Sequence, residues 1–411
     1  MSIDPTTPVV VLWVHHGSLG IARSLGRLGV PVHGVHPDPG VPACQSRYWQ
    51  AVHRWNFATE PAERSLEFLL RLSDAIGRRA VLIPTSDHLA EFVAEHADRL
   101  RGRFLFQDNS PALVKALSHK RLLHELAVRH GVPTPATEFP TSVADVAAYA
   151  ARTTFPVMLK ASDGLRLQAR TGKKMVIVHS AAELLEQYRR LEDPDHPDLM
   201  LQEYIPGGDD TIWMFNGYFD RASRCLMGLT GKKIRQHPIH TGATSLGICL
   251  PNETVLRQTA DFMAAIGYQG ILDIGWRFDA RDGTYKLLDP NPRIGSTFRL
   301  FVGENGLDVA RALYLDLTGQ PVPVTTLRNG RRWMVEDQDL ESALDYAAEG
   351  SLTLGDWLGS LPGLEEGAWF AWDDLRPVRV VMGGLVARAA RRVATRLKPP
   401  TRAEARAPSP A

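Results

Sequence analysis

GILDIGWRFDARDGTYKLLDPNPRIGSTFR, which is residues 270–299, predicts two β-strands joined by a turn. Apolar residues dominate 271–278, as expected for a buried strand, but Asp273 lies among them. The residues ARDG at 280–283 are typical of a turn, and a second strand follows at 285–288. The second strand runs directly into the polar sequence DPNPR at 289–293. The stretch therefore places polar side chains on two paired strands.

These polar side chains indicate a metal site. A carboxylate inside an apolar strand, such as Asp273, is costly unless it is paired or bound to a metal. Asp289 and Asn291 follow on the neighbouring strand, with Arg293 close by. Carboxylate and amide oxygens, together with bound phosphates, are the ligands that Mg²⁺ prefers. The alternative is an ordinary hairpin whose turn carboxylates are solvated.

Composition excludes several classes of protein. The chain has 411 residues, enough for two or three domains, and its apolar fraction of 44% permits sizeable cores. The net charge of +1 argues against a nucleic-acid partner. The three cysteines, Cys44, Cys225 and Cys249, form no CxxC motif and suit a reducing compartment. No signal peptide and no membrane-spanning run is apparent, so we expect a cytoplasmic protein.

The N-terminal part predicts a parallel α/β sheet. Strands at 8–14 and 30–35 flank a helix at 21–28, which is a βαβ unit. The turn between the first strand and the helix does not read G-x-G-x-x-G, so nicotinamide binding is a weak alternative. His15 and His16 in this turn are expected to line a cleft or to cap the strand end. We expect this α/β domain to span residues 1–115.

A second group of polar residues follows the strand at 155–160. Lys160 ends that strand, so its ammonium group emerges where the sheet ends; the alternative is that it extends into solvent. The polar stretch 162–174 is predicted to be a loop between two strands. Its basic residues and glycines suit a flap over phosphates, and an ordinary long hairpin loop is the alternative.

The C-terminal part carries a weaker signal. Several tryptophans predict a small packed appendage over 321–398, and residues 399–411 are expected to be a disordered tail. Residues 378–397 predict a helix with one apolar and one basic face. Such a helix suits an anionic membrane surface, but docking on its own protein is the favoured interpretation.

The order of these motifs resembles the ATP-grasp superfamily. The matching motifs are the helix that begins near Lys120 and ends in GVPTP at 131–135, FPVMLK at 155–160, QEYIPG at 202–207 and DPNPR at 289–293. The sequence is most similar to carboxylate–amine ligases of the D-aspartate-ligase and carbamoyl-phosphate-synthase-like kind. The resemblance implies a Rossmann-like pre-ATP-grasp domain, followed by an ATP-grasp domain over 116–320 with a lid subdomain at about 152–206.

The resemblance also assigns roles to individual residues. It implies that ATP and Mg²⁺ (or Mn²⁺) are used, and that Arg293 meets the acyl phosphate or the carboxylate. Three more basic residues would line the acceptor side: Lys233, Arg235 and Arg299. The ATP-binding residues would be Lys120, Lys160, Gln202, Glu203, Tyr204, Ile205 and either Asp209 or Asp210. The metal ligands would be Asp273, Asp289 and Asn291.

The implied function is the ATP-dependent joining of a carboxylate to an amine through an acyl phosphate, giving ADP and phosphate. The partners are then small molecules, and a homodimer is compatible with the fold. The family usually has Glu where Asp289 stands, and often where Asp273 stands. A non-catalytic or regulatory ATP-binding protein is therefore the alternative function.

Overall fold

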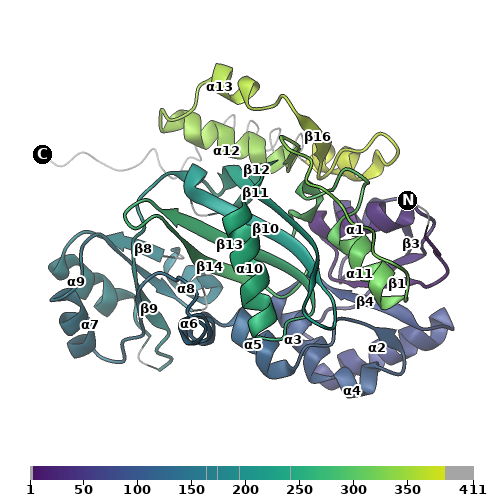
Figure 1. The fold of residues 1–411 in the computed structure, drawn as a ribbon, viewed down its shortest axis with the longest axis horizontal. Helices are drawn as coiled ribbons and strands as arrows, with labels where there is room; N and C mark the ends of the chain where they lie inside the picture. The colour runs from purple at the N-terminus through teal and green to yellow at the C-terminus, as the bar shows by residue number, and fades with distance from the viewer. Residues whose placement is uncertain (1–2, 163, 174, 194, 241, 385–411) are drawn as a thin grey trace, which may run out of the picture.

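The computed structural model describes residues 3–162, 164–173, 175–193, 195–240 and 242–384 (Figure 1). The described residues form a parallel N-terminal sheet, a small antiparallel sheet and a large central sheet. We call the small sheet and its helices the lid. In Figure 1 the lid lies on the left, the central sheet in the middle and the N-terminal sheet on the right.

The N-terminal sheet has the strand order β3-β2-β1-β4-β5, and all its pairs are parallel. Its inner strands β1 and β4 are buried at every residue, which is why the sequence shows continuous apolar runs there. The predicted α/β domain is present, but its first helix begins at His16 and not at residue 21. The elements are β1 (Val9–Leu12), α1 (His16–Gly26), β2 (Val32–Val35), β3 (Trp49–His53), α2 (Ala62–Ile76), β4 (Ala80–Pro84), α3 (Asp87–Glu95), α4 (Ala97–Leu100) and β5 (Phe104–Leu105).

The lid is an antiparallel sheet of order β6-β9-β7-β8, covered by α7 and α9. It begins at Thr137, earlier than the predicted residue 152. Two helices, α5 (Pro111–Ser118) and α6 (Lys120–Arg129), lead into it. The lid elements are β6 (Thr137–Glu138), α7 (Val143–Ala150), β7 (Val157–Ala161), α8 (Gly164–Thr171), β8 (Met175–Val178), α9 (Ala181–Leu191) and β9 (Leu199–Glu203).

The prediction of a loop over 162–174 is wrong for most of its length. Helix α8 occupies Gly164–Thr171. Between the two glycines the sequence consists largely of good helix formers, Leu, Arg, Gln and Ala. Leu167 is buried in the lid core, so tertiary packing supports a helix that the flanking glycines obscured.

The central sheet has the order β14-β13-β10-β11-β12-β15-β16. The predicted hairpin of 270–299 is its β13–β14 edge, and α10 covers one face (Figure 1). The last two strands come from the predicted appendage, which therefore extends this sheet. The elements are β10 (Ile212–Phe219), β11 (Cys225–His237), β12 (Ala243–Cys249), α10 (Glu253–Ala265), β13 (Gly270–Asp279), β14 (Thr284–Asn291), α11 (Val309–Leu317), β15 (Arg332–Met334), α12 (Glu336–Ala348), α13 (Leu354–Gly359) and β16 (Leu364–Gly367).

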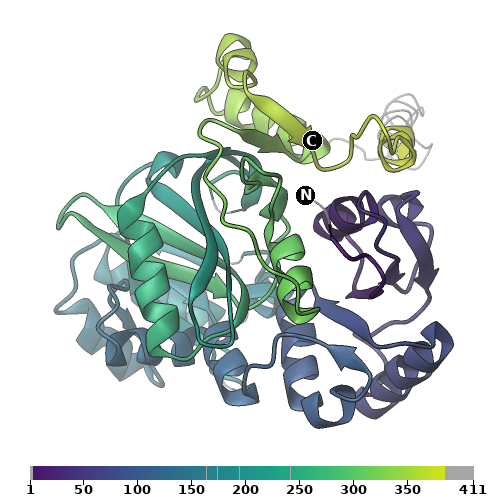
Figure 2. The same ribbon diagram turned by 45° about the vertical axis from the view of Figure 1, so that its right-hand side comes forward.

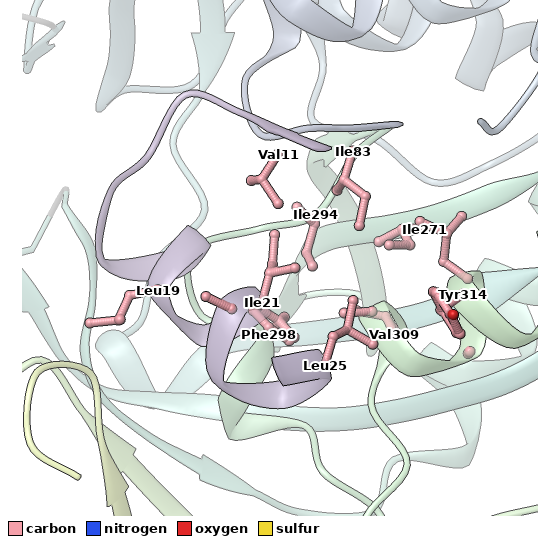
Figure 3. Close-up of a cluster of buried hydrophobic side chains, with 14 of the residues drawn as sticks. Val11, Leu19, Ile21, Leu25, Ile83, Ile271, Ile294, Phe298, Val309 and Tyr314 are labelled. Carbon is pink, nitrogen blue, oxygen red and sulfur yellow. The ribbon is translucent and has the colours of Figure 1, made fainter. Parts of the chain in front are cut away.

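One apolar core joins the N-terminal sheet to the central sheet (Figure 3). Val11 and Ile83 come from the N-terminal sheet, whereas Ile271 comes from β13. Ile294 and Phe298 lie in the segment that follows β14, and both are almost fully buried. The lid has a separate core of its own. Packing therefore fixes the segment after β14 against the N-terminal sheet and leaves the lid outside that shared core.

The appendage forms the β15–β16 edge of the central sheet and continues from there to the N-terminal domain (Figure 2). There Arg23 of α1 forms a buried ion pair with Asp374 at 2.9 Å. Residues 376–384 are helical, and the rest of the predicted helix 378–397, like the predicted tail 399–411, lies outside the described residues. Among the described residues, no helix combines the length and apolar character needed to cross a membrane.

Candidate active site

A cavity of about 850 Å³ lies between the lid, the central sheet and the appendage. Most of the residues that the sequence predicted for ATP binding line it, although they come from distant parts of the chain. The cavity lining does not include Asp210, Asp273, Asn291, Arg293 or Arg299. The predicted residues that do line it are Lys120, Lys160, Gln202, Glu203, Tyr204, Ile205, Asp209, Lys233, Arg235 and Asp289.

Strand alternation decides which lid residues face this cavity. Leu159 and Leu201 are opposite one another and belong to the lid core. Successive side chains of a strand point to opposite faces, so Lys160 faces the cavity. Met158, two residues earlier on the same strand, shares this face. Cross-strand partners also share a face, so Met175 opposite Lys160, and Ile177 and Gln202 opposite Met158, line the cavity as well.

Two lysines make one part of the cavity electropositive. Lys120 is the first residue of α6, and its Nζ donates to the Ala161 carbonyl oxygen at 3.2 Å. Burial and the neighbouring Lys120 lower the pKa of Lys160 to about 8, and Asp289 only partly offsets them. Two ammonium groups that repel one another in a partly desolvated cavity suit a polyanionic ligand such as phosphate.

The strand register of the β13–β14 hairpin brings two carboxylates and one amide together. We call these residues, Asp273, Asp289 and Asn291, the acidic floor of the site. Asp273 of β13 lies opposite Asn291 of β14, and Asp289 lies opposite Gly275. Burial raises the pKa of Asp273 to about 6, and Arg293, then Lys233, partly offset this effect. Asp289 is exposed to the cavity, yet protein surrounds it on most sides, and this desolvation raises its pKa. Both carboxylates would gain from a bound cation.

The floor also has the shape and chemistry for a divalent cation. A Cβ on Gly295 would lie 1.9 Å from Asp273 Oδ2, so only glycine leaves room for that carboxylate. No three His, Cys, Asp or Glu side chains of the described residues converge on a point. The candidate ligands are two carboxylates and the Asn291 amide oxygen, which suits Mg²⁺ because that ion commonly keeps waters and substrate phosphates as ligands.

Arg293 connects this floor to the N-terminal sheet. Its Nε donates to Asp87 Oδ1 at 2.8 Å, and one Nη donates to Asn291 Oδ1 at 2.9 Å. Asp87 is the first residue of α3, the helix that follows β4. The guanidinium is therefore oriented from both sides beside the predicted metal ligands.

Glu203 lies at the junction between the lid and the central sheet. Its carboxylate accepts from Lys286 Nζ at 2.7 Å, from Arg281 at 3.2 Å and from the Ala136 backbone at 3.1 Å. Its side chain is thus held by the protein although the residue lines the cavity. Gln202 donates to Thr137 at 2.9 Å within the lid.

Only one of the two alternative ATP-binding aspartates, Asp209 and Asp210, lines the cavity. Asp210 is exposed and is not part of the cavity lining, whereas Asp209 lines it. Gln236 Nε2 donates to Asp209 Oδ1 at 2.8 Å, and the Tyr346 hydroxyl donates to the other oxygen. Tyr346 belongs to α12, so the appendage contributes to the cavity wall. Sequence reasoning missed this residue because no local pattern links it to Asp209.

Two of the predicted acceptor residues form ion pairs within the protein. Arg235 is almost fully buried and forms a bidentate ion pair with Asp339 of α12, at 2.8 Å for both contacts. Arg299 is held by Asp308 and Glu366. Both guanidinium groups thus form ion pairs with carboxylates of the protein. Arg235 connects β11 to the appendage, and Arg299 connects the segment after β14 to α11 and to the appendage.

Lys233, for which the resemblance implies a place on the acceptor side, is one of the cavity-lining residues. Its Nζ contacts Gln236 Oε1 at 3.2 Å and the Gly242 carbonyl oxygen at 3.1 Å. Burial lowers the pKa of Lys233, and the carboxylates of Asp273 and Asp209 oppose that effect.

His15 caps the first helix of the chain. It is the N-cap of α1, and its Nδ1 accepts from the Gly17 backbone at 2.9 Å. Burial and the neighbouring His16 lower the pKa of His15 to about 3, so the ring stays neutral and can keep accepting. The expected capping role is therefore found at the start of the helix.

Comparison with known proteins identifies the fold. The chain matches no protein-family model. It is 26% identical over 304 residues to the D-aspartate ligase of Enterococcus faecium (strain Aus0004), which covers 69% of this chain and 71% of that ligase. It is 25% identical over 232 residues to the carbamoyl phosphate synthase large chain of Beutenbergia cavernae, covering 52% of this chain and 20% of that protein.

Among solved structures, the biotin carboxylase domain of the 2-oxoglutarate carboxylase of Hydrogenobacter thermophilus, determined with MgADP, ADP and bicarbonate, superposes with a TM-score of 0.59. The identity is 16%, and the match covers 79% of this chain and 72% of that one. The chain has the ATP-grasp fold. The predicted fold is therefore confirmed, and the cavity of this ATP-grasp chain lies between its lid and its central sheet.

Proposed function

We propose that the chain is an ADP-forming ligase that joins a carboxylate to an amine. The observation that carries the proposal is the convergence of Lys120, Lys160 and Asp289 on one cavity. The Asp273–Asn291 pair lies beside Asp289 on the same two strands. The similarity to a D-aspartate ligase supports this class of reaction.

The reaction has two steps. A carboxylate oxygen of the substrate attacks the γ-phosphorus of ATP, the bond to the ADP oxygen breaks, and ADP leaves. The nitrogen of an amine then attacks the acyl carbon, the bond to phosphate breaks, and the nitrogen loses a proton. The products are an amide, ADP and phosphate, and no protein nucleophile is needed.

The protein contributes position and charge. Lys120 and Lys160 hold the phosphates, and Arg293, oriented by Asp87, meets the reacting carboxylate. A divalent cation on Asp273, Asp289 and Asn291 would supply charge neutralisation for the transferred phosphoryl group. The lid limits the access of water, which would otherwise hydrolyse the acyl phosphate.

The test is ADP release that depends on both a carboxylate and an amine. A panel of amino acids of both configurations, D-aspartate included, would be offered as each substrate. Asp289→Ala is expected to abolish ADP formation without loss of fold. Asp282→Ala is the matched control, because Asp282 is an exposed carboxylate in the turn of the same hairpin. Full turnover by Asp289→Ala would show that the metal-site assignment is wrong.

Nucleotide binding without turnover is the second candidate. The observation in its favour is Asp, which is one methylene shorter than the Glu usual in the family, at positions 273 and 289. MgADP binding together with no ADP formation across the whole panel would select it.

We further propose a cytoplasmic location and a homodimer. The three cysteines are free thiols in the structure, as expected in a reducing compartment. The related biotin carboxylase domain was solved as a dimer. Light scattering on the purified chain distinguishes a dimer from a monomer.

A further inference from the structure

Asn216 has a fully buried side chain that makes no well-formed hydrogen bond but lies close to the Asp273 carboxylate. The residue lies in β10, and its relative exposure is 0%. Both its Nδ2 and its Oδ1 are buried, and neither makes a hydrogen bond of acceptable geometry. Buried carboxamides are almost always satisfied, because an unsatisfied polar group destabilises the fold. The unsatisfied side chain of Asn216 therefore requires an explanation.

Strand register places this amide beside the acidic floor. Asn216 is directly opposite Asp273, which in turn is opposite Asn291. The three side chains form a row on one face of the central sheet, since opposite residues share a face. The neighbours of Asn216 on the same face of β10, Met214 and Tyr218, belong to the apolar core. An apolar residue would therefore be expected at 216 on packing grounds alone.

Another buried asparagine shows what a purely structural carboxamide looks like in this chain. Asn109 is 5% exposed, and both its polar groups are satisfied by the backbone of Gln269. Its Nδ2 donates to the Gln269 carbonyl oxygen at 2.7 Å, and its Oδ1 accepts from the Gln269 nitrogen at 3.0 Å. Asn216 has no such backbone partner.

We propose that Asn216 positions the Asp273 carboxylate for the divalent cation of the nucleotide site. One carboxylate oxygen of Asp273 would bind the cation while the other accepts from Asn216 Nδ2. Hydrogen bonds of this kind commonly orient metal-binding carboxylates. The inference rests on the proposed function, because it assumes that the cavity takes a nucleotide with its cation.

The test compares Asn216→Leu with Asn109→Leu, using ADP with and without Mg²⁺ as the probe. Asn216→Leu removes two buried polar atoms that make no well-formed hydrogen bond, and the Asp273 carboxylate that it leaves can take up a proton in the metal-free chain, so thermal unfolding without metal should occur at about the same temperature. Its MgADP affinity, measured by calorimetry, should fall by about tenfold, the lower end for loss of such a partner. Its affinity for ADP without metal should be unchanged. Asn109→Leu should unfold at a lower temperature and keep the MgADP affinity.

Several outcomes would overturn the inference. Asn216→Leu with a lower unfolding temperature and unchanged MgADP affinity would make Asn216 a structural residue. If Asn216→Leu fails to fold, Asn216→Ala takes its place, and an unchanged ratio of MgADP to ADP affinity has the same meaning. Absence of MgADP binding by the unsubstituted chain would overturn both this inference and the proposed function. If the unsubstituted chain binds MgADP but forms no amide, only the proposed ligase activity would be overturned, and the role of Asn216 would still be tested by the MgADP affinities.

Discussion

The Asp273 carboxylate lies against Gly295, so closely that a Cβ at residue 295 would be 1.9 Å from Oδ2. Gly295→Ala must therefore displace the carboxylate. We expect ADP formation to fall by about a hundredfold, the size of effect expected when a reacting group is misplaced by about 1 Å. Gly102→Ala is the control, since its Cβ would meet nothing within 4 Å and the residue lies outside the hairpin and the cavity lining. Equal activity in both variants would contradict the assigned role of Asp273.

Nucleotide affinity should depend on pH through Lys160. The pKa of Lys160 is lowered to about 8 by burial and by Lys120, and bound phosphate should raise it again. Below pH 8 the ammonium is charged in the free and the bound state, so affinity is constant. Above pH 8 binding requires uptake of a proton, and affinity should fall by up to about tenfold per pH unit. Calorimetry with ADP between pH 7 and 9.5 measures this slope.

Lys160→Arg provides the matching control for the pH dependence. Its guanidinium stays charged throughout that range, so the slope above pH 8 should largely disappear. An unchanged slope in this variant would assign the titration to another group.

Tyr346 should contribute to nucleotide binding from the appendage. Its hydroxyl donates to Asp209, and burial together with Asp209 raises the pKa of Tyr346 to about 12, so it remains a donor at neutral pH. Tyr346→Phe removes the hydrogen bond that orients Asp209, so ADP affinity should fall by up to about tenfold, the limit set by a hydrogen bond to a charged group worth about 1.5 kcal/mol.

Tyr48→Phe is a matched control for this loss. The Tyr48 hydroxyl also donates to an appendage carboxylate, that of Asp373 at 2.6 Å, but Tyr48 does not line the cavity. Its ADP affinity should match that of the unsubstituted chain. A similar loss in both variants would indicate a general loosening of the appendage.

Arg235 should stabilise the folded chain through its ion pair with Asp339. Arg235→Leu leaves Asp339 buried without its charged partner, which should cost about 3–5 kcal/mol of unfolding free energy. The double variant Arg235→Leu/Asp339→Leu should recover part of that loss, because no charge then remains buried. Urea denaturation measures both changes. Unchanged stability of Arg235→Leu with lost turnover would support the catalytic role that the sequence suggested.

The parts of the fold that depend on local patterns could be predicted from the sequence. Apolar runs indicated β1 and β4 because both faces of the N-terminal sheet are covered. The strand alternation of the β13–β14 hairpin placed Asp273 near Asn291, and the structure has them directly opposite one another. The hairpin turn sets that register, so a short stretch of sequence contains the information.

The parts that depend on distant partners could not be predicted. The sequence could not show that Arg235, which lines the cavity, is paired with Asp339, because that carboxylate lies 104 positions later. The orphaned state of Asn216 is likewise visible only once its strand neighbours are known. Helix α8 was missed for a related reason, since the buried position of Leu167 depends on the lid core.

The division of the apolar cores has a thermodynamic consequence. Val11 and Ile83 share one core with Ile271 and Phe298, so the N-terminal sheet and the central sheet should lose their structure together. The lid has its own core, and a unit of this kind can open or unfold locally at a lower free energy than the whole chain. A nucleotide that contacts both Lys160 and Asp289 would connect the lid to the rest of the chain. Nucleotide binding should then mainly slow the hydrogen exchange of the backbone amides in the lid.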